Sequence, residues 1–201
     1  MSEPSSGRPD IRDTDESWPV LSSRDIHRDD WVVAVREDTI TRPEGGEPFD
    51  RLVVEHPGAA MVLAIDDEHR VLVLSQYRHP VRERVYQLPA GVLDEPGESP
   101  LEVAKRELRE EAEYAAASWT PLISYLVSPG FTDQRFHVFL ARELSHVGRG
   151  DFELEHEEMD LVTEWVRFTD LLDDVTAGRV EDGGLVTAVL AYNVKSRRGE
   201  L

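Results

Sequence analysis

The sequence predicts an α+β fold in which a mixed sheet lies between helices, and three observations support this prediction. Antiparallel hairpins are interleaved with three helix-like segments along the chain. The segments 59–65 (AAMVLAI) and 71–76 (VLVLSQ) are almost entirely apolar, as central strands are. Apolar residues recur at helical spacing between residues 100 and 112. The chain has 201 residues, of which 40% are apolar, and this is enough for one sizeable domain.

The part of the chain before this domain has a different character. Residues 1–17 are rich in Ser, Pro, Asp and Glu and show no periodicity, so a disordered tail is expected there. Strands are expected at 19–26, 31–40 and 51–56 because these runs are rich in β-branched and apolar residues. The segment 41–50, which holds Pro and Gly, is expected to be a loop.

The remaining elements follow from the same signals. Further strands are expected at 85–88, 120–127, 134–142 and 162–168. The segment 143–160 is dense in acidic residues and is expected to be a loop. Helices are expected over 169–177, ended by Gly178, and from Gly183 or Gly184 onward, where Leu185, Val189 and Tyr192 share a face.

The charge balance narrows the classes of partner. Formal net charge is −19, from 41 acidic and 22 basic residues, and such a surface repels the phosphates of nucleic acids. There is no cysteine, so disulfides, thiol catalysis and thiolate metal sites are excluded. No apolar run approaches the roughly 18 residues of a membrane span, and the N-terminus does not read as a signal peptide. A cytoplasmic protein without nucleic-acid or membrane partners is expected.

The helix predicted near the middle of the chain carries a clear start signal. Ser99 is a suitable N-cap, and Pro100 falls at the first helical position. Glu102 follows Ser99 by three residues, so the two side chains can form a capping box. The helix is therefore expected to begin at Pro100.

Three glutamates gather on one side of this helix. Glu107 and Glu111 are one turn apart, and Glu110 is three residues after Glu107. Like charges at this spacing destabilise a helix by about 0.2–0.5 kcal/mol per pair. A divalent cation such as Mg²⁺ would offset the repulsion, because it prefers carboxylate ligands together with substrate phosphate. The alternative is a solvated acidic helix face in a very acidic protein.

The loop before the helix supports the first interpretation. Loop and helix together hold, in this order, Gly91, Glu98, Arg106, Glu107, Leu108, Glu110 and Glu111. This arrangement resembles the Nudix box of the Nudix hydrolases. Two features depart from the family pattern. The gap 92–97 is one residue longer, and Glu113 stands where the family has a glycine. If that position is left-handed, a non-Gly residue there costs roughly 1 kcal/mol or more.

The resemblance implies a fold and an activity. It implies a Nudix α/β/α sandwich over 58–201, preceded at 18–57 by a small antiparallel sheet that makes a homodimer. Pro129, the run Gln76-Tyr77-Arg78 and the inserted loop residue are similar to the ADP-ribose pyrophosphatase branch, the last to its actinobacterial members. Members of that branch hydrolyse ADP-ribose to AMP and ribose 5-phosphate.

The resemblance also implies roles for single residues. The metal, Mg²⁺ or alternatively Mn²⁺, is expected on Glu107, Glu111 and Glu110 and on the carbonyl of Ala90. Arg106 belongs to the catalytic motif and is expected to pair with Glu98, so that it holds the loop against the helix. The general base is expected in the acidic segment, at Glu157 or Glu158, with Asp160 as a third candidate.

Substrate contacts are expected outside this cluster. Arg78 is a candidate phosphate clamp, because a guanidinium binds phosphate bidentately. Gly91 is expected next to the substrate, and Trp31 and Phe131 are candidate partners for adenine. Two alternatives remain open: a different nucleoside-diphosphate derivative, such as GDP-mannose or NADH, or a Nudix-fold sensor that binds the ligand without turnover.

Overall fold

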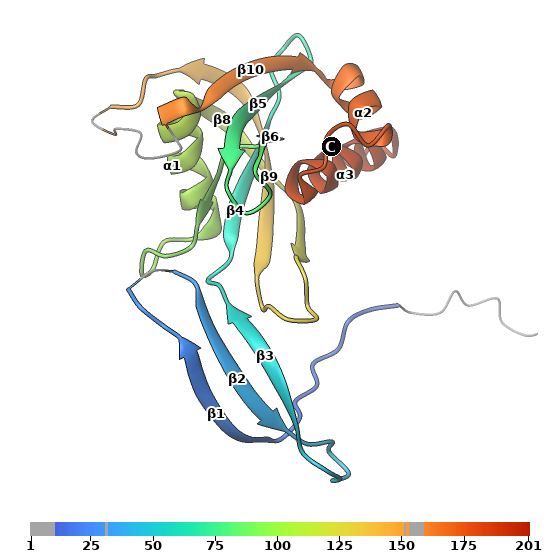
Figure 1. Cartoon of the computed structure of the whole chain (residues 1–201). Helices are drawn as coiled ribbons and strands as arrows, with labels where there is room; N and C mark the ends of the chain where they lie inside the picture. The colour runs from blue at the N-terminus through green and yellow to red at the C-terminus, as the bar shows by residue number, and fades with distance from the viewer. Residues whose placement is uncertain (1–10, 31, 151, 153–158) are drawn as a thin grey trace, which may run out of the picture.

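The computed structural model describes residues 11–30, 32–150, 152 and 159–201. Figure 1 shows two parts, a compact body and an antiparallel sheet that extends away from it. The extended part, called here the N-terminal sheet, consists of β1 (Val20–His27), β2 (Ala34–Ile40) and β3 (Phe49–Glu55), in that order. Every residue of β1 is exposed. Residues 11–17 lie before this sheet, outside any helix or strand, and are exposed.

The body contains two further sheets and three helices. One sheet has the order β7-β4-β9-β8, formed by β4 (Ala59–Ala64), β7 (Ala90–Val92), β8 (Tyr114–Leu126) and β9 (Arg135–His146). It is mixed, because β4 and β9 are parallel. The other has the order β10-β5-β6, formed by β5 (Arg70–Arg78), β6 (Glu83–Gln87) and β10 (Val162–Arg167). The helices are α1 (Pro100–Ala112), α2 (Phe168–Thr176) and α3 (Gly183–Arg197).

Successive side chains of the central strands point to opposite faces of the sheet, and this divides the core into two clusters. In β4, Met61 and Leu63 pack in a cluster with residues of α2 and α3, whereas Ala60 and Val62 pack in a cluster with residues of α1. Successive side chains of a strand point to opposite faces, so one strand supplies both clusters. Figure 1 shows α1 on one side of the strands and α2 and α3 on the other. The predicted α/β/α sandwich with a mixed sheet is confirmed.

Several element boundaries differ from the prediction. The strand expected from residue 120 begins at Tyr114, directly after α1, and the strand expected to end at 142 continues to His146. Tyr114 and His146 face each other, so each extension is the pairing partner of the other. The prediction that the loop begins at 143 was therefore wrong for residues 143–146. None of the described helices is long and apolar enough to cross a membrane.

The N-terminal sheet is joined to the body at the end of β3. The Val54 amide donates to the carbonyl of Phe131 at 2.7 Å, and the His56 amide donates to Asp133 Oδ1 at 3.1 Å. The half-buried His56 ring then accepts a hydrogen bond from the Gly58 amide through Nδ1, at 3.0 Å. Burial lowers the pKa of His56, against the opposite effect of the Asp133 carboxylate. The junction therefore favours a neutral imidazole.

Candidate active site

Helix α1 begins as the sequence predicts. Ser99 has extended backbone angles, and its hydroxyl accepts a hydrogen bond from the Glu102 amide at 3.3 Å. The Glu102 carboxylate in turn accepts one from the Ser99 amide at 2.8 Å, which completes the capping box. This bond from the Ser99 backbone holds the pKa of Glu102 below its ordinary value. The start of the helix is thereby fixed relative to the loop that precedes it.

Two of the three glutamates face strand β7. Glu111 is only 7% exposed, and its Oε2 accepts a hydrogen bond from the Ala90 amide at 2.8 Å. The Glu107 side chain lies against Gly91, where a Cβ atom would overlap its carboxylate. Glycine at position 91 thus leaves room for the Glu107 carboxylate against β7, and a larger residue would displace that side chain. The structure brings together four of the predicted residues: Ala90, Gly91, Glu107 and Glu111.

Arg106 binds the carboxylates from the other side. Its Nη1 donates to Glu107 Oε1 at 2.6 Å and to Glu110 Oε2 at 3.1 Å. Its Nη2 pairs with Glu98 Oε2 at 3.3 Å, which confirms the expected contact between loop and helix. The guanidinium therefore joins Glu98 of the loop to Glu107 and to Glu110, which lies one helical turn further along. Burial by itself lowers the pKa of Arg106, but these carboxylates outweigh it, and the net shift is upward.

A cavity of about 450 Å³ opens beside this cluster. Its lining is strongly acidic, with Arg106 as the one basic residue among the described side chains that form it. The lining residues are Asp94, Glu95, Glu98, Arg106, Glu110 and Phe152. An anionic substrate would be repelled by such a wall unless a cation intervened. The cavity is therefore suited to a metal-bound phosphate and not to a bare one.

The donor set fits a hard divalent cation. Within the described part of the chain, no group of three His, Cys, Asp or Glu side chains is already arranged to hold a metal ion. The chemistry of the donors nevertheless matches Mg²⁺ or Mn²⁺, because carboxylate oxygens of Glu107, Glu110 and Glu111 occupy adjacent turns of one helix. Two of these carboxylates pair with Arg106, so the cluster attracts positive charge.

Comparison with known proteins decides the family. Residues 55–186 match the family model described as NUDIX domain, which covers most of the body and the whole glutamate-bearing helix. The chain belongs to the Nudix family.

Two of the proteins that this chain resembles are named ADP-ribose pyrophosphatase. That of Mycobacterium tuberculosis is 37% identical over 179 residues, which cover 89% of this chain and 84% of the relative. That of Bacillus subtilis is 39% identical over 150 residues, which cover 75% and 80% of the two chains. A methanol dehydrogenase activator from Bacillus methanolicus is 35% identical over 158 residues, or 79% and 83%. A solved structure of an ADP compounds hydrolase agrees in fold, with a TM-score of 0.74 at 20% identity, covering 94% of this chain and 100% of the other.

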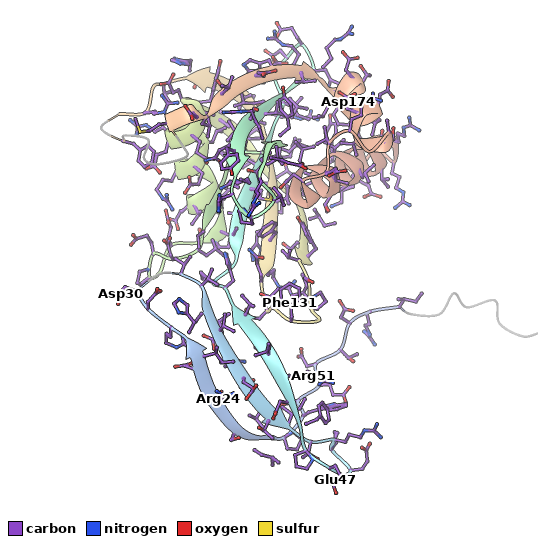
Figure 2. The ribbon with its side chains drawn as sticks, in the orientation of Figure 1. Arg24, Asp30, Glu47, Arg51, Phe131 and Asp174 are labelled. Carbon is purple, nitrogen blue, oxygen red and sulfur yellow. The ribbon has the colours of Figure 1, made fainter. Side chains whose placement is uncertain are left out.

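Two of the predicted substrate residues lie on elements other than the Nudix helix, Arg78 at the end of β5 and Phe131 in the loop between β8 and β9. Arg78 Nε donates to Gln87 Oε1 at 2.6 Å, and Gln87 Nε2 donates to Asp182, the N-cap of α3, at 2.9 Å. Figure 2 shows Phe131 on the loop beside β3, where it is 53% exposed. Trp31 lies outside the described residues. Arg78, Phe131 and Trp31 therefore stay predictions.

The predicted base lies in a segment of which little is described. Glu157 and Glu158 are outside the described residues. The third candidate, Asp160, is exposed, and its carbonyl accepts a hydrogen bond from Arg84 at 3.0 Å. The assignment of the base stays a prediction.

Sequence reasoning missed a residue that contacts the Nudix helix. Arg149 donates to the carbonyl of Glu110 through Nε at 2.7 Å and to that of Glu111 through Nη2 at 3.2 Å. Its Nη1 donates to Glu113 Oε1 at 2.7 Å. The available signal was the sequence Gly148-Arg149-Gly150, because two glycines around one arginine indicate a tight turn that can present its side chain.

Proposed function

We propose that this protein is a divalent-metal-dependent Nudix pyrophosphohydrolase that hydrolyses ADP-ribose to AMP and ribose 5-phosphate. The observation that carries the proposal is the packing of Glu107 and Glu111 against Ala90 and Gly91. Solvated residues of an acidic helix face would project into water, whereas Glu111 is buried and hydrogen-bonded. The names of the relatives from M. tuberculosis and B. subtilis support ADP-ribose as the substrate.

The proposed chemistry depends on how this chain holds its carboxylates. Glu107, Glu110, Glu111 and the carbonyl of Ala90 would hold Mg²⁺, or Mn²⁺ in its place. When bound, such an ion neutralises the charge that grows on a pyrophosphate and lowers the pKa of a bound water. The hydrogen bond from the Ala90 amide keeps Glu111 directed at β7. Arg106 holds Glu107 and Glu110 and ties them to Glu98 of the loop.

The remaining roles are proposed from the resemblance. Glu157 or Glu158 would accept the proton of the attacking water, with Asp160 as the third candidate. Arg78 would bind phosphate bidentately, and Phe131 and Trp31 would stack on adenine. Gly91 lies beside Glu107, so a substrate bound to the metal would approach its backbone closely.

The N-terminal sheet supports a homodimer as the working form. The exposed strand β1 carries large apolar side chains at Val20, Leu21 and Ile26, and exposed apolar side chains that gather on one element mark a candidate protein–protein interface. We therefore propose that the chain has two functional parts: residues 18–57 form the dimer, and residues 58–201 carry out hydrolysis. We also propose a cytoplasmic location, which agrees with the absence of cysteine.

A sensor without turnover is weakened by the geometry at Glu113. The sequence favours that alternative because Glu113 replaces a family glycine. In the structure Glu113 has φ 66° and ψ 20°, the left-handed conformation that glycine adopts readily. The helix therefore ends in the conformation that a glycine would give it. The name of the B. methanolicus relative, an activator, keeps a regulatory role as the second candidate.

The experiment that tests the proposal is AMP release from ADP-ribose, measured with MgCl₂ and with EDTA beside GDP-mannose and NADH. We expect release from ADP-ribose in MgCl₂ and none in EDTA. Release of GMP from GDP-mannose or of AMP from NADH, without AMP from ADP-ribose, would keep the chemistry and change the substrate. Binding of ADP-ribose without any turnover would overturn the proposal and favour the sensor.

A further inference from the structure

Arg149 contacts the Nudix helix at the turn that carries two of the proposed metal ligands. It lies in the segment 147–150, which follows β9 and passes the C-terminal end of α1. Its guanidinium donates to the main-chain carbonyls of Glu110 and Glu111 and to the side chain of Glu113. All three acceptors belong to the last turn of α1 or to its cap. One side chain from a distant part of the sequence thus binds the whole helix exit.

The helix itself leaves these carbonyls without partners. The last four carbonyls of an α-helix have no intrahelical donor, and a cation near them also interacts favourably with the helix dipole. The Glu113 amide donates to the carbonyls of Leu108 and Arg109. Arg149 donates to the next two carbonyls along the chain, those of Glu110 and Glu111. The main chain on both sides of these glutamates is therefore fixed by hydrogen bonds.

The contact is reciprocal, which makes it a built feature of the fold. Arg109 of the helix donates through Nε to the carbonyl of Gly148 at 3.3 Å. The amides of Val147 and Gly148 donate to the carbonyl of Glu113, at 2.8 and 3.2 Å. Gly148 and Gly150 both have positive φ, 72° and 71°, so that the segment can turn closely around the helix exit.

We propose that Arg149 is a positioning residue for the proposed hydrolysis: it fixes the last turn of α1 and so holds the carboxylates of Glu110 and Glu111 where they bind metal. This inference rests on the proposed function. Arginine suits the role because its planar guanidinium offers five donors in a fixed fork. A lysine ammonium is a compact point charge and cannot span three acceptors in the same way.

The test compares Arg149→Met and Arg149→Lys with Arg179→Met. Methionine keeps much of the aliphatic stem but removes every donor. Arg179 is a matched control, because it is an exposed arginine that pairs with Asp174 on the other side of the body and loses the same charge. The first measurement is amide hydrogen exchange of residues 110–113 in EDTA, which needs neither metal nor substrate. The second is a Mg²⁺ titration, in which the Mg²⁺ concentration at half-maximal effect (the Mg²⁺ midpoint) is measured in two ways. One readout is the thermal denaturation temperature and the other is the rate of AMP release.

We expect Arg149→Met to speed exchange at residues 110–113 and to raise the Mg²⁺ midpoint by about tenfold, the usual effect of losing a group that orients a metal ligand. KM for ADP-ribose at saturating Mg²⁺ should change by less than about twofold, because the donors of Arg149 are engaged by the end of α1. Arg149→Lys should restore little, and Arg179→Met should behave as wild type. If Arg149→Met does not fold, the exchange at residues 110–113 and the Mg²⁺ midpoint are measured on Arg149→Lys, and the same two results support or overturn the inference.

Unchanged exchange at residues 110–113, or an unchanged Mg²⁺ midpoint in the folded variant, would overturn the inference. Failure of the proposed function can be distinguished from failure of this inference. If the proposed function is wrong, the wild type releases no AMP, but the exchange experiment and the Mg²⁺ dependence of thermal denaturation still report on Arg149.

Discussion

The missing side chain of Gly91 decides where Glu107 lies. Because position 91 has no Cβ, the Glu107 carboxylate can rest on the backbone of β7, next to the Ala90 amide that binds Glu111. Two carboxylates one turn apart are in this way turned toward the same three-residue strand. At the residue scale the proposed site is therefore built by two glutamate side chains that pack against the backbone of Ala90 and Gly91 in β7.

Replacing Glu111 by glutamine tests this arrangement. Glutamine has the same shape and an amide oxygen that can still accept the hydrogen bond from Ala90, so we expect the fold to survive. The negative charge is lost, and several kcal/mol of metal-dependent stabilisation should go with it. AMP release should fall by about 100-fold or more, measured at fixed Mg²⁺ beside a thermal denaturation curve.

Glu102→Gln is the matched control for that variant. It makes the same charge change on the same helix, but at the exposed first turn, where the side chain only completes the capping box. Its AMP release should stay close to that of the wild type. A Glu111→Gln protein with a near-wild-type rate would refute the assignment of Glu111 as a metal ligand.

At the scale of the element, α1 shows what local sequence can predict and what it cannot. Ser99 and Glu102 predicted the first turn because a capping box needs only residues three apart. The early start of β8 was missed, because its first residues, 114–118 (YAAAS), are mostly small and have little intrinsic strand preference. They form a strand because β9 lies opposite. The contacts of Arg106 with Glu107 and Glu110 were not predicted for a similar reason, since they depend on how the loop that carries Glu98 packs against the helix.

The exit of α1 gives a prediction about stability. Glu113 is left-handed, which costs a non-Gly residue roughly 1 kcal/mol. Its carboxylate accepts from Arg149 and pairs with His146 at 3.1 Å, partly exposed contacts worth about 0–1 kcal/mol. Both Glu113→Gly and Glu113→Ala lose these contacts, but only alanine keeps a Cβ. We expect the glycine variant to be the more stable of the two by about 1 kcal/mol.

Urea unfolding of the two variants checks this expectation, and comparing them removes the contribution of the lost contacts. The wild type should lie close to the glycine variant, because relief of strain and loss of the contacts offset each other. Equal free energies of unfolding for glycine and alanine would show that the left-handed backbone carries no such cost here.

On the scale of the whole molecule, the N-terminal sheet and the body meet through a small number of groups. Figure 2 shows Phe131 at this junction, with Glu47 at the far end of the sheet and Asp174 at the opposite end of the molecule. Gly58 has φ 94°, and a Cβ there would approach the carbonyl of Arg135 to 2.8 Å. The chain therefore enters the body through a position that requires glycine. Sequence predicted the strands on either side of this junction, but not the pairing of Val54 with the loop of Phe131.

The junction should respond to pH through His56. Its pKa is lowered in the folded protein, so the folded state binds fewer protons than the unfolded state below a pH of about 6.5. The contribution of His56 to stability is therefore complete above that pH and is lost as the pH falls through and below it. In His56→Asn an amide oxygen can replace Nδ1 as the acceptor for Gly58 without titrating. As the pH falls from about 8 to about 5.5, the free energy of unfolding of the wild type should therefore decrease relative to that of His56→Asn.

Urea titrations at several pH values measure that difference, and comparing the two proteins cancels the titration of the other histidines and carboxylates. His137 in particular also has a lowered pKa, from burial and the nearby Arg135, and it is common to both proteins. A difference that stays constant with pH would mean that His56 is equally protonated in the folded and unfolded states.

The parallel pairing of β4 with β9 has a consequence for biosynthesis. Residue 59 faces residue 136, so the central strand gains this partner only after α1 and β8 have been made. Bringing such distant segments together carries a loop-closure cost before any contact repays it, and non-local pairing of this kind slows folding. The hairpins of the N-terminal sheet involve near neighbours and can close while the ribosome is still adding the body. The nascent chain would thus expose an apolar β4 for much of its synthesis, a period in which chaperones have most reason to act.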